Sequence, residues 1–212
     1  MPELFHHRKE YLKSTLSEDQ VSNDPFIQFH NWFNEVTDAG LSYPTAMVLS
    51  TCDADNRPSS RIVLLKEFNA EGFMFFTHYL SRKGKHIGRN PFGSLLFPWH
   101  ELERQVRIEG TVEKVDKTTS DIYFGSRPEG SMVAAWTSPQ SETIPSREYL
   151  ERIEKKYRHQ FASGKIERPP DWGGFLLKPD LFEFWQGREN RLHDRIEYYL
   201  EGKNWEIRRL AP

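Results

Sequence analysis

Residues 45–79 read TAMVLSTCDADNRPSSRIVLLKEFNAEGFMFFTHY and contain three short runs rich in branched and aromatic residues. The runs are TAMVLSTCD, RIVLLKEF and GFMFFTHY, and the turn-forming clusters ADNRP and NAEG separate them. Short runs bounded by Asn, Asp, Pro and Gly are typical of β-strands joined by turns. This stretch therefore predicts three consecutive strands in an antiparallel meander.

More runs with the composition of strands follow along the chain. FGSLLFPW begins at residue 92, and RQVRIEGTVEKV begins at residue 104. In the second run Gln105 and Arg107 fall on one face of a strand, while Val106 and Ile108 fall on the other. Towards the end the chain reads GGFLLKP, LFEFWQG, DRIEYYLEG and NWEIRRLAP, and the last two runs predict a hairpin.

The N-terminal region, residues 1–40, is predicted to be a helical extension that packs on the sheet. Asp24 suits the cap of a helix and Pro25 its first turn, and apolar side chains recur at helical spacing beyond them. A second helical stretch is expected from about Lys117, and a clearer helix from Ser146.

These elements belong to one fold. About seven strands with a few flanking helices are typical of an α+β protein built around a β-barrel. A chain of 212 residues can bury a sizeable core without disulfides or a structural metal. We therefore expect a single domain that spans residues 1–212.

Charge and composition exclude several classes of partner. With 29 basic and 31 acidic residues the formal net charge is −2, which gives no global attraction to nucleic acid or to an anionic membrane. No apolar run is long enough to span a bilayer, and the start of the chain lacks the apolar core of a signal peptide. The single cysteine, Cys52, cannot form an internal disulfide, so we expect a cytoplasmic protein.

Several common functional motifs are missing from the sequence. It contains no G-x-G-x-x-G, G-x-x-x-x-G-K-[ST], G-x-S-x-G, C-x-x-C or H-E-x-x-H. These absences weigh against dinucleotide-binding, P-loop, α/β-hydrolase and common zinc sites. The adjacent pair His193 and Asp194 lacks the further ligands that a metal site needs, and we expect no metal.

Basic residues gather in two segments that suit anion binding. Arg61 and Lys66 bracket an apolar run that is expected to be buried on both faces, and cations at the ends of such a strand need an anionic partner unless they snorkel into solvent. Arg82, Lys83 and Lys85 lie beside Ser81 and Gly84 at the predicted start of a short helix, and this segment offers cationic, hydroxyl and backbone donors to a phosphate. A solvated run of charges is the alternative interpretation of this segment.

A third group indicates a second anion site. Tyr123, Arg127 and Ser131 are spaced four residues apart along a helical stretch broken by Pro128. A phenol, a guanidinium and a hydroxyl at this spacing can converge on one oxyanion. The pair Arg127 and Pro128 could equally end a helix.

A fourth group lies near the C-terminus. Arg191, His193 and Arg195 occupy alternate positions, so an extended backbone would point all three side chains to one face. Three such groups repel one another unless an anion lies between them. Trp185 and Gln186, just upstream, could add a planar wall and an amide, although core packing is the alternative role of Trp185.

Taken together, these stretches resemble the pyridoxamine 5′-phosphate oxidase family, also called the pyridoxine 5′-phosphate oxidase family. The resemblance covers nearly the whole chain after Asp24, and its specificity comes from ERQVR, RIVLLK and RLHDR occurring together. The matching stretches are RIVLLK, SRKG, FPWHELERQVRIEG, YFGSRPEGS, SPQS, and the sequence from WGGF through EFWQGRENRLHDR to RRLAP.

The resemblance implies a split β-barrel homodimer that holds FMN at the subunit interface. It also implies oxidation of pyridoxamine and pyridoxine 5′-phosphates to pyridoxal 5′-phosphate, with dioxygen reduced to hydrogen peroxide. The FMN contacts that it assigns are Arg61, Ile62, Val63, Leu64, Leu65, Lys66, Phe76, Thr77, Arg82, Lys83, Gln105, Gln140, Ser141, Trp185 and Arg195. The substrate contacts that it assigns are Lys66, Tyr123, Arg127, Ser131, Arg191, Leu192 and His193, with Arg191 and His193 as the catalytic residues.

Two other functions are compatible with parts of the pattern. A non-catalytic carrier of flavin or pyridoxal phosphate would need the phosphate-binding clusters, but it would not need Arg191 and His193. A flavin reductase that uses a nicotinamide cofactor would need no small-phosphate pocket, which Tyr123, Arg127 and Ser131 are expected to form. The residues therefore favour the oxidase.

Overall fold

The computed structural model describes residues 10–162 and 164–212, so the first nine residues of the expected N-terminal helix lie outside the described part. The chain divides into two compact units. Unit 1 consists of Met1–Leu49, Ser94–Gly110 and Pro179–Pro212, and unit 2 consists of Ser50–Gly93 and Thr111–Lys178.

Nine strands among the described residues form one hydrogen-bonded sheet. They are β1 (Ala46–Cys52), β2 (Pro58–Leu64), β3 (Glu67–Asn69), β4 (Gly72–His78), β5 (Phe92–Trp99), β6 (Arg104–Lys114), β7 (Trp172–Gln186), β8 (Asp194–Glu201) and β9 (Asn204–Arg209). The strand order is β2-β1-β5-β6-β7-β4-β3, with β8 paired to β7 and β9 paired to β8. The strands β1, β5, β6 and β7 contribute residues to both units.

The expected meander of the first three runs is wrong. The run RIVLLKEF divides between β2 and β3, and β4 pairs with β3 and with β7 rather than with β2. In the antiparallel ladder of β4 and β7, Phe73 lies opposite Leu177 and Phe75 opposite Phe175. All four side chains are buried, so long-range apolar contacts rather than the local turns decide the partner of β4.

Strand β2 also differs from its sequence-based interpretation. It was expected to be buried on both faces, but Ile62 is 71 % exposed and Leu64 is 42 % exposed. The strand stands at the end of the sheet order, so one chain alone leaves part of its apolar surface uncovered. Strand β6 follows its predicted alternation, because Val106 and Ile108 are fully buried while Gln105 and Arg107 are partly exposed.

The helices of the described residues are short. They are α1 (Pro25–Asp38), α2 (Arg82–Ile87), α3 (Lys117–Gly125), α4 (Glu129–Thr137) and α5 (Arg147–Gln160). Asp24 caps α1 as predicted, since its carboxylate accepts the N–H groups of Phe26 and Ile27. Among the described residues, no helix has the length and apolar character required to cross a membrane.

Residues 10–24 are not helical, which corrects the expectation of helix throughout the N-terminal region. The backbone N–H groups of Leu12 and Lys13 donate to the carboxylate of Glu103, and that of Leu16 donates to the carboxylate of Asp194. These distant carboxylates take the place of the carbonyl groups that a helix would supply.

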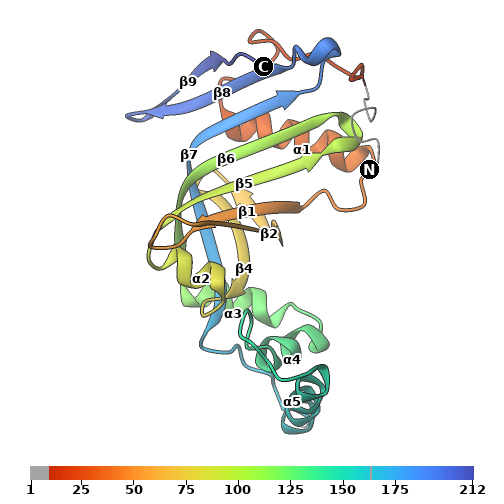
Figure 1. The fold of residues 1–212 in the computed structure, drawn as a ribbon, viewed down its shortest axis with the longest axis vertical. Helices are drawn as coiled ribbons and strands as arrows, with labels where there is room; N and C mark the ends of the chain where they lie inside the picture. The colour runs from red at the N-terminus through yellow and green to blue at the C-terminus, as the bar shows by residue number, and fades with distance from the viewer. Residues whose placement is uncertain (1–9, 163) are drawn as a thin grey trace, which may run out of the picture. The chain divides into compact units, whose positions relative to one another are not determined.

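In unit 1, α1 packs an apolar face on the strands beside it (Figure 1). The rings of Phe29 and Phe97 are 5.0 Å apart, and those of Trp32 and Phe184 are 5.3 Å apart, in edge-to-face arrangements. Phe29, Phe97 and Phe184 are fully buried, and Trp32 is 3 % exposed. These four aromatic side chains form the part of the unit 1 core that lies against α1.

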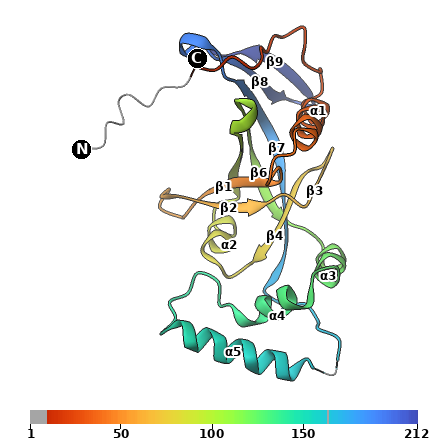
Figure 2. The ribbon, with the colours of Figure 1, turned by 90° about the vertical axis from the view of Figure 1, so that its right-hand side faces the viewer.

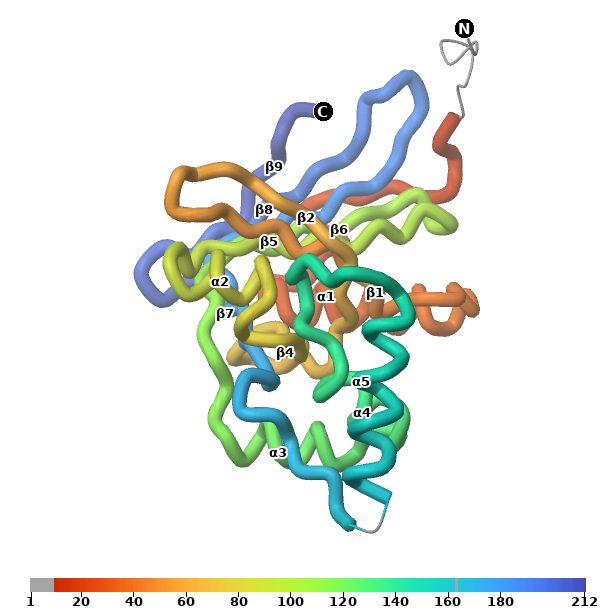
Figure 3. Tube along the Cα trace, turned by 60° about the horizontal axis from the view of Figure 1, so that its bottom comes forward, coloured from red at the N-terminus to blue at the C-terminus, as the bar shows by residue number. Residues whose placement is uncertain are grey.

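In unit 2, the helical stretch expected from Lys117 divides into α3 and α4. Pro128 occupies the N-cap position of α4, and Ser126 and Arg127 link the two helices. Figures 2 and 3 show α4 and α5 side by side. Ser146 caps α5 as predicted, because its hydroxyl accepts the N–H group of Tyr149.

Candidate functional site

Lys83 forms the centre of a polar cluster in unit 2. The side chain is only 8 % exposed, although it extends from the first turn of α2. Its Nζ donates to Oε1 of Gln140 at 2.7 Å, to Oγ1 of Thr77 at 3.2 Å and to Oγ of Ser81 at 3.3 Å. All three acceptors are neutral, so these bonds leave the positive charge of Lys83 without compensation.

Neighbouring cations strengthen the positive field at this cluster. Burial, and then the charge of Arg61, lower the pKa of Lys83 to about 8. Burial and the charge of Arg82 likewise lower the pKa of Arg61. Arg61 donates to Oγ1 of Thr51 and to Oγ of Ser59, which holds its guanidinium in place. An anion at this cluster would relieve the mutual repulsion of the three cations.

Local backbone packing holds α2 in position. Ser81 caps the helix, since its hydroxyl accepts the N–H group of Gly84. A Cβ atom on Gly84 would lie 2.1 Å from the carbonyl oxygen of Tyr79, so only glycine allows this close approach. Lys85, in contrast, is exposed and pairs with Glu142 at 2.7 Å, which separates it from the buried cluster.

The other predicted residues near Lys83 lie in three places in unit 2. Residues 61–64 belong to β2, and the N–H group of Lys66 donates to the carbonyl oxygen of Met74, so β4 supports this stretch. Phe76 and Thr77 are in β4. Gln140 and Ser141 are exposed residues after α4, and Ser141 has a left-handed backbone with φ of 75°.

Tyr123 belongs to an aromatic stack in unit 2. Its ring lies 3.9 Å from that of Phe76 and 6.1 Å from that of Trp172, nearly parallel to both. The Nζ atom of Lys66 lies 5.9 Å from the centre of the Tyr123 ring. The stack therefore fixes the phenol of Tyr123 beside the exposed cationic side chain of Lys66.

Arg127 lies against the same stack. Its guanidinium carbon is 4.6 Å from the centre of the Trp172 ring. Burial lowers the pKa of Arg127, and its Nη1 atom is buried with no hydrogen-bond partner among the described residues. A buried guanidinium nitrogen without an acceptor indicates a place for an anionic ligand. Ser131 lies half-buried in α4, one turn beyond Pro128.

In unit 1, Trp185 and His193 form a second aromatic group with Tyr11. The rings of Trp185 and His193 are 4.6 Å apart, and the ring of Tyr11 is 5.7 Å from each. A Cβ atom on Gly187 would lie 2.7 Å from Tyr11, so a glycine there makes room for the tyrosine. Trp185 is thus only partly buried, and its ring contacts those of Tyr11 and His193.

The protonation state of His193 follows from its surroundings. Burial, and then the positive charge of Arg191, lower the pKa of His193. Its Nδ1 atom accepts the backbone N–H group of Arg188 at 3.1 Å. The imidazole is therefore neutral at neutral pH and carries its proton on Nε2, which makes Nε2 a donor for a ligand.

Arg191 does not follow the predicted alternation. β8 begins only at Asp194, and Arg191 ends a 3₁₀ turn with a left-handed backbone at φ of 62°. The side chains of Arg191 and Leu192 are exposed. Asp194 pairs with Arg188 and Arg209 at 2.8 Å each, so it does not neutralise Arg191.

Gln105 and Arg195 are the remaining predicted site residues in unit 1. Gln186, in contrast, has a structural role. Arg195 lies opposite Trp185 in the ladder of β7 and β8. Gln186 is fully buried, and its amide is occupied by Arg104 and by the carbonyl groups of Leu102 and Glu103. The suggestion that Gln186 supplies a free amide is therefore wrong.

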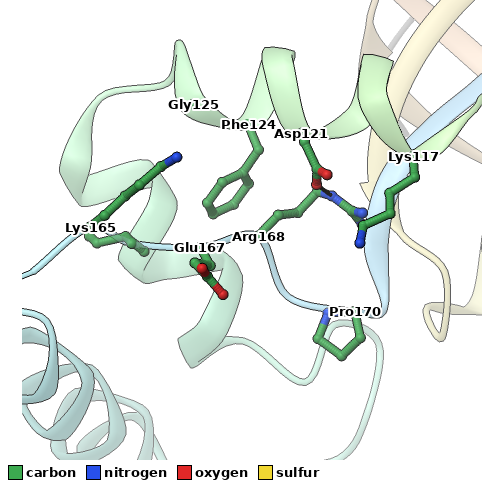
Figure 4. Close-up of a pocket in the computed structure, with 9 residues that line it drawn as sticks. Lys117, Asp121, Phe124, Gly125, Lys165, Glu167, Arg168 and Pro170 are labelled. Carbon is green, nitrogen blue, oxygen red and sulfur yellow. Dashed lines mark hydrogen bonds and ion pairs between the residues drawn. The ribbon is translucent and has the colours of Figure 1, made fainter.

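A separate pocket in unit 2 contains none of the predicted residues. It has a volume of about 390 Å³ and lies between α3 and residues 165–170 (Figure 4). Arg168 and Asp121 pair at 2.6 Å in its wall. The charge of this arginine is thus balanced within the protein, unlike that of Lys83.

The predicted residues fall into one set in each unit. Unit 2 holds the stretch from Arg61 to Lys66, Phe76, Thr77, Arg82, Lys83, Tyr123, Arg127, Ser131, Gln140 and Ser141, and unit 1 holds Gln105, Trp185, Arg191, Leu192, His193 and Arg195. Sequence reasoning missed Tyr11, Arg188 and Glu183. Of these, only Glu183 has a local signal, since it is an acid between the apolar residues of a strand.

Known proteins match the chain over nearly its whole length. A family model described as pyridoxamine 5′-phosphate oxidase matches residues 33–161, and one described as the pyridoxine 5′-phosphate oxidase C-terminal dimerisation region matches residues 172–212. A pyridoxine/pyridoxamine 5′-phosphate oxidase of Cupriavidus necator is 52 % identical over 213 residues, which are 100 % of each chain. One of a Cyanothece species is 48 % identical, over 97 % of this chain and 96 % of the relative.

Solved structures show the same fold. PhzG from Burkholderia lata, solved with tetrahydrophenazine-1-carboxylic acid, superposes with a TM-score of 0.88 at 27 % identity, over 94 % of this chain and 98 % of the other. An FMN-binding protein of Nostoc punctiforme superposes with a TM-score of 0.70 at 17 % identity, over 91 % and 100 %. The fold class expected from the sequence, an α+β split β-barrel, is confirmed.

Proposed function

The chain belongs to the pyridoxamine 5′-phosphate oxidase family, and on this premise we propose that it oxidises pyridoxamine and pyridoxine 5′-phosphates to pyridoxal 5′-phosphate. Pyridoxine 5′-phosphate and dioxygen give the aldehyde and hydrogen peroxide. Pyridoxamine 5′-phosphate also consumes water and releases ammonia. The matches to the two family models and to the relatives confirm the family resemblance carried by ERQVR, RIVLLK and RLHDR.

The observation that carries this proposal is a pair of cations whose charge the described residues do not balance. Lys83 is buried among neutral acceptors, and Arg127 has a buried nitrogen without an acceptor. The reaction requires two phosphorylated molecules, the cofactor and the substrate. Unit 2 has two separate cationic sites, at Lys83 and at Arg127, and each would bind one of the two phosphate groups.

The residues fit FMN as the cofactor. Arg61, Arg82 and Lys83 would hold its phosphate, with Thr77, Gln140 and Ser141 as further polar contacts. Residues 62–66, Phe76, Gln105, Trp185 and Arg195 would contact the rest of the molecule. FMN, when bound, supplies the acceptor for the hydride that leaves the substrate. The chain itself supplies binding, orientation and electrostatics.

The substrate would be held at its phosphate and at its ring. Lys66, Tyr123, Arg127 and Ser131 would bind the phosphate. Arg191, Leu192 and His193 would contact the ring, with Nε2 of His193 donating to a ring substituent. Holding the ring in this way fixes the reacting carbon towards the hydride acceptor, and we assign Arg191 and His193 as the catalytic residues on this basis.

We expect two copies of the chain to form the active protein. The match to a C-terminal dimerisation region over residues 172–212 supports a homodimer. The exposed apolar side chains of Ile62 and Leu64 on β2 support it as well, because a second copy would remove them from water. FMN at the subunit interface and a cytoplasmic location remain predictions from the sequence.

The proposed activity is tested by incubating the purified protein and FMN in air with pyridoxamine 5′-phosphate and, separately, with pyridoxine 5′-phosphate. We expect the aldehyde and hydrogen peroxide in equal amounts. A protein that binds FMN tightly but forms no aldehyde from either vitamer would contradict the oxidase and favour a carrier.

The pKa of Lys83 gives a prediction for the pH dependence of FMN binding. Because the pKa is about 8, the side chain loses its proton as the pH rises through that value, and the attraction to phosphate is lost with it. We expect the Kd of FMN to be about tenfold higher near pH 9 than near pH 7, since each pH unit above the pKa lowers the protonated fraction by about tenfold. Fluorescence titration of the apoprotein measures this change.

The control for this pH dependence is Lys83→Arg. Arginine keeps its proton throughout this range, so the variant should show a nearly flat profile between the same two pH values. A wild-type profile that is also flat would contradict the assignment of Lys83 to the cofactor phosphate.

Arg127→Ala tests the assignment of the second phosphate site. The variant loses a charged hydrogen bond to the substrate phosphate, worth roughly 1.5–3 kcal/mol, so KM should rise by about ten- to a hundredfold. The substrate phosphate is remote from the reacting carbon, so kcat should fall much less. Steady-state kinetics with pyridoxamine 5′-phosphate give both values.

Arg147→Ala is the matched control, because Arg147 is an exposed arginine on α5 that pairs with Glu151 on the same helix. It should leave KM unchanged. If Arg127→Ala instead raised the Kd of FMN and left KM unchanged, the two phosphate sites would be assigned the wrong way round.

A further inference from the structure

Glu183 is a buried carboxylate in the middle of the unit 1 sheet. It lies in β7 between Phe182 and Phe184, and its side chain is only 3 % exposed. Removing a carboxylate from water is costly, and a buried ion pair often adds no net stability compared with apolar residues of similar size. A buried carboxylate in a strand of mainly apolar residues therefore points to a role beyond packing.

The two oxygen atoms of Glu183 bind two arginines from the neighbouring strands. Oε1 accepts Nε of Arg195 on β8 at 2.8 Å, and Oε2 accepts Nη2 of Arg107 on β6. Burial alone would raise the pKa of Glu183, but the two guanidinium groups outweigh it and lower the pKa. The carboxylate thus stays ionised and holds together two cations that would otherwise repel each other.

This group shares a face of the sheet with the residues assigned to FMN in unit 1. Residues two positions apart on a strand point to the same side, so Glu183 is on the side of Trp185, and Arg107 is on the side of Gln105. Arg195 lies opposite Trp185 in the ladder. The carboxylate of Glu183 therefore connects the strands that carry three of the proposed cofactor contacts.

The hydrogen bonds of Arg195 leave one nitrogen available. Nε donates to Glu183, and Nη1 donates to the carbonyl oxygen of Ala211 at 2.8 Å. Within the described part of the chain, Nη2 makes no such bond. A guanidinium held at two nitrogens has few remaining orientations, so its third nitrogen can bind a ligand without first losing rotational freedom.

We propose that Glu183 is a positioning residue that holds Arg195 ready for FMN. This inference rests on the proposed function, because it takes Arg195 as a contact of the cofactor. It adds a residue that does not touch the cofactor but sets the affinity of one that does. The negative charge of Glu183 matters as much as its shape. A neutral amide in its place could accept from one guanidinium only by turning its NH₂ group towards the other.

The test compares the Kd of FMN for apoprotein variants by quenching of flavin fluorescence. Glu183→Gln, which keeps size but removes the charge, should raise the Kd by about tenfold or more. If Glu183 acts through Arg195, the same change in an Arg195→Ala background should raise the Kd by less than about twofold, because the two substitutions remove one interaction. The melting temperature of each apoprotein shows whether it remains folded.

Glu197→Gln is a matched control. Glu197 lies opposite Glu183 in the ladder of β7 and β8, is 4 % exposed, and pairs with Arg208 on β9. The Glu197→Gln variant should lower the melting temperature much as Glu183→Gln does, yet it should change the Kd of FMN by less than about twofold. If Glu183→Gln fails to fold, Glu183→Asp replaces it in the test, because aspartate keeps the charge on a shorter side chain. Glu183→Asp should raise the Kd of FMN by a smaller factor, and this rise should likewise depend on Arg195.

Three results would overturn the inference, and they lead to two distinguishable conclusions. If the wild-type apoprotein binds FMN but Glu183→Gln matches Glu197→Gln in both Kd and melting temperature, Glu183 has only a structural role, and the proposed function stands. An equal rise of the Kd in the wild-type and Arg195→Ala backgrounds leads to the same conclusion. If the wild-type apoprotein binds no FMN at all, the proposed function fails together with this inference.

Discussion

Arg191→Ala is expected to lower kcat/KM by at least about a hundredfold while the protein stays yellow. The exposed side chain of Arg191 follows a left-handed turn of the backbone two residues before His193, whose ring lies 4.6 Å from that of Trp185. In the proposed function it holds the substrate ring, and a displacement of the reacting carbon by about 1 Å can cost about a hundredfold in rate. Peroxide-coupled kinetics with pyridoxamine 5′-phosphate measure the loss.

His193→Ala and Lys203→Ala complete this comparison. His193→Ala should be milder, about tenfold, because a neutral histidine that donates from Nε2 helps to position the ring without having to move a proton. Lys203 lies in the exposed turn between β8 and β9, so its replacement should have no effect. Near-normal turnover in both Arg191→Ala and His193→Ala would favour the carrier over the oxidase.

Lys83→Ala is expected to weaken FMN binding by about ten- to a hundredfold. The substitution removes a buried cation whose three present partners are neutral, and with it a charged hydrogen bond to phosphate worth roughly 1.5–3 kcal/mol. Flavin titration of the apoprotein measures the Kd. Arg82→Ala should act in the same direction.

Lys85→Ala is the matched control for Lys83→Ala. Lys85 lies two residues further along the same helix, but it is exposed and pairs with Glu142. Its replacement should leave the Kd of FMN unchanged. Equal Kd values for the wild type and both variants would make this segment an ordinary solvated run of charges.

Local patterns predicted most of the elements and one of the clusters. Alternation predicted the faces of β6, and the cap residues Asp24, Ser81 and Ser146 mark the starts of α1, α2 and α5. The cluster at Arg82 and Lys83 could be predicted because its chemistry lies within a few adjacent residues. Such features depend on residues that are close together in the sequence, so one sequence is enough to predict them.

Features that depend on distant contacts could not be predicted in this way. The partner of β4 depends on burial against β7, a strand about a hundred residues later in the chain. The segment with Tyr11 is held by Glu103 and Asp194, so its conformation has no local pattern. The alternation that placed Arg191 beside His193 failed because it assumed a strand where the backbone turns.

The most direct test of the oxidase is a single turnover without oxygen. The FMN-loaded protein is mixed anaerobically with an excess of pyridoxamine 5′-phosphate, and the yellow flavin absorbance and the aldehyde are followed together. We expect the yellow colour to be lost as about one aldehyde forms per flavin, and to return when air is admitted, because in the proposed function the flavin accepts the hydride and dioxygen is the final oxidant. Flavin that stays fully yellow in the presence of bound substrate would contradict the proposed function.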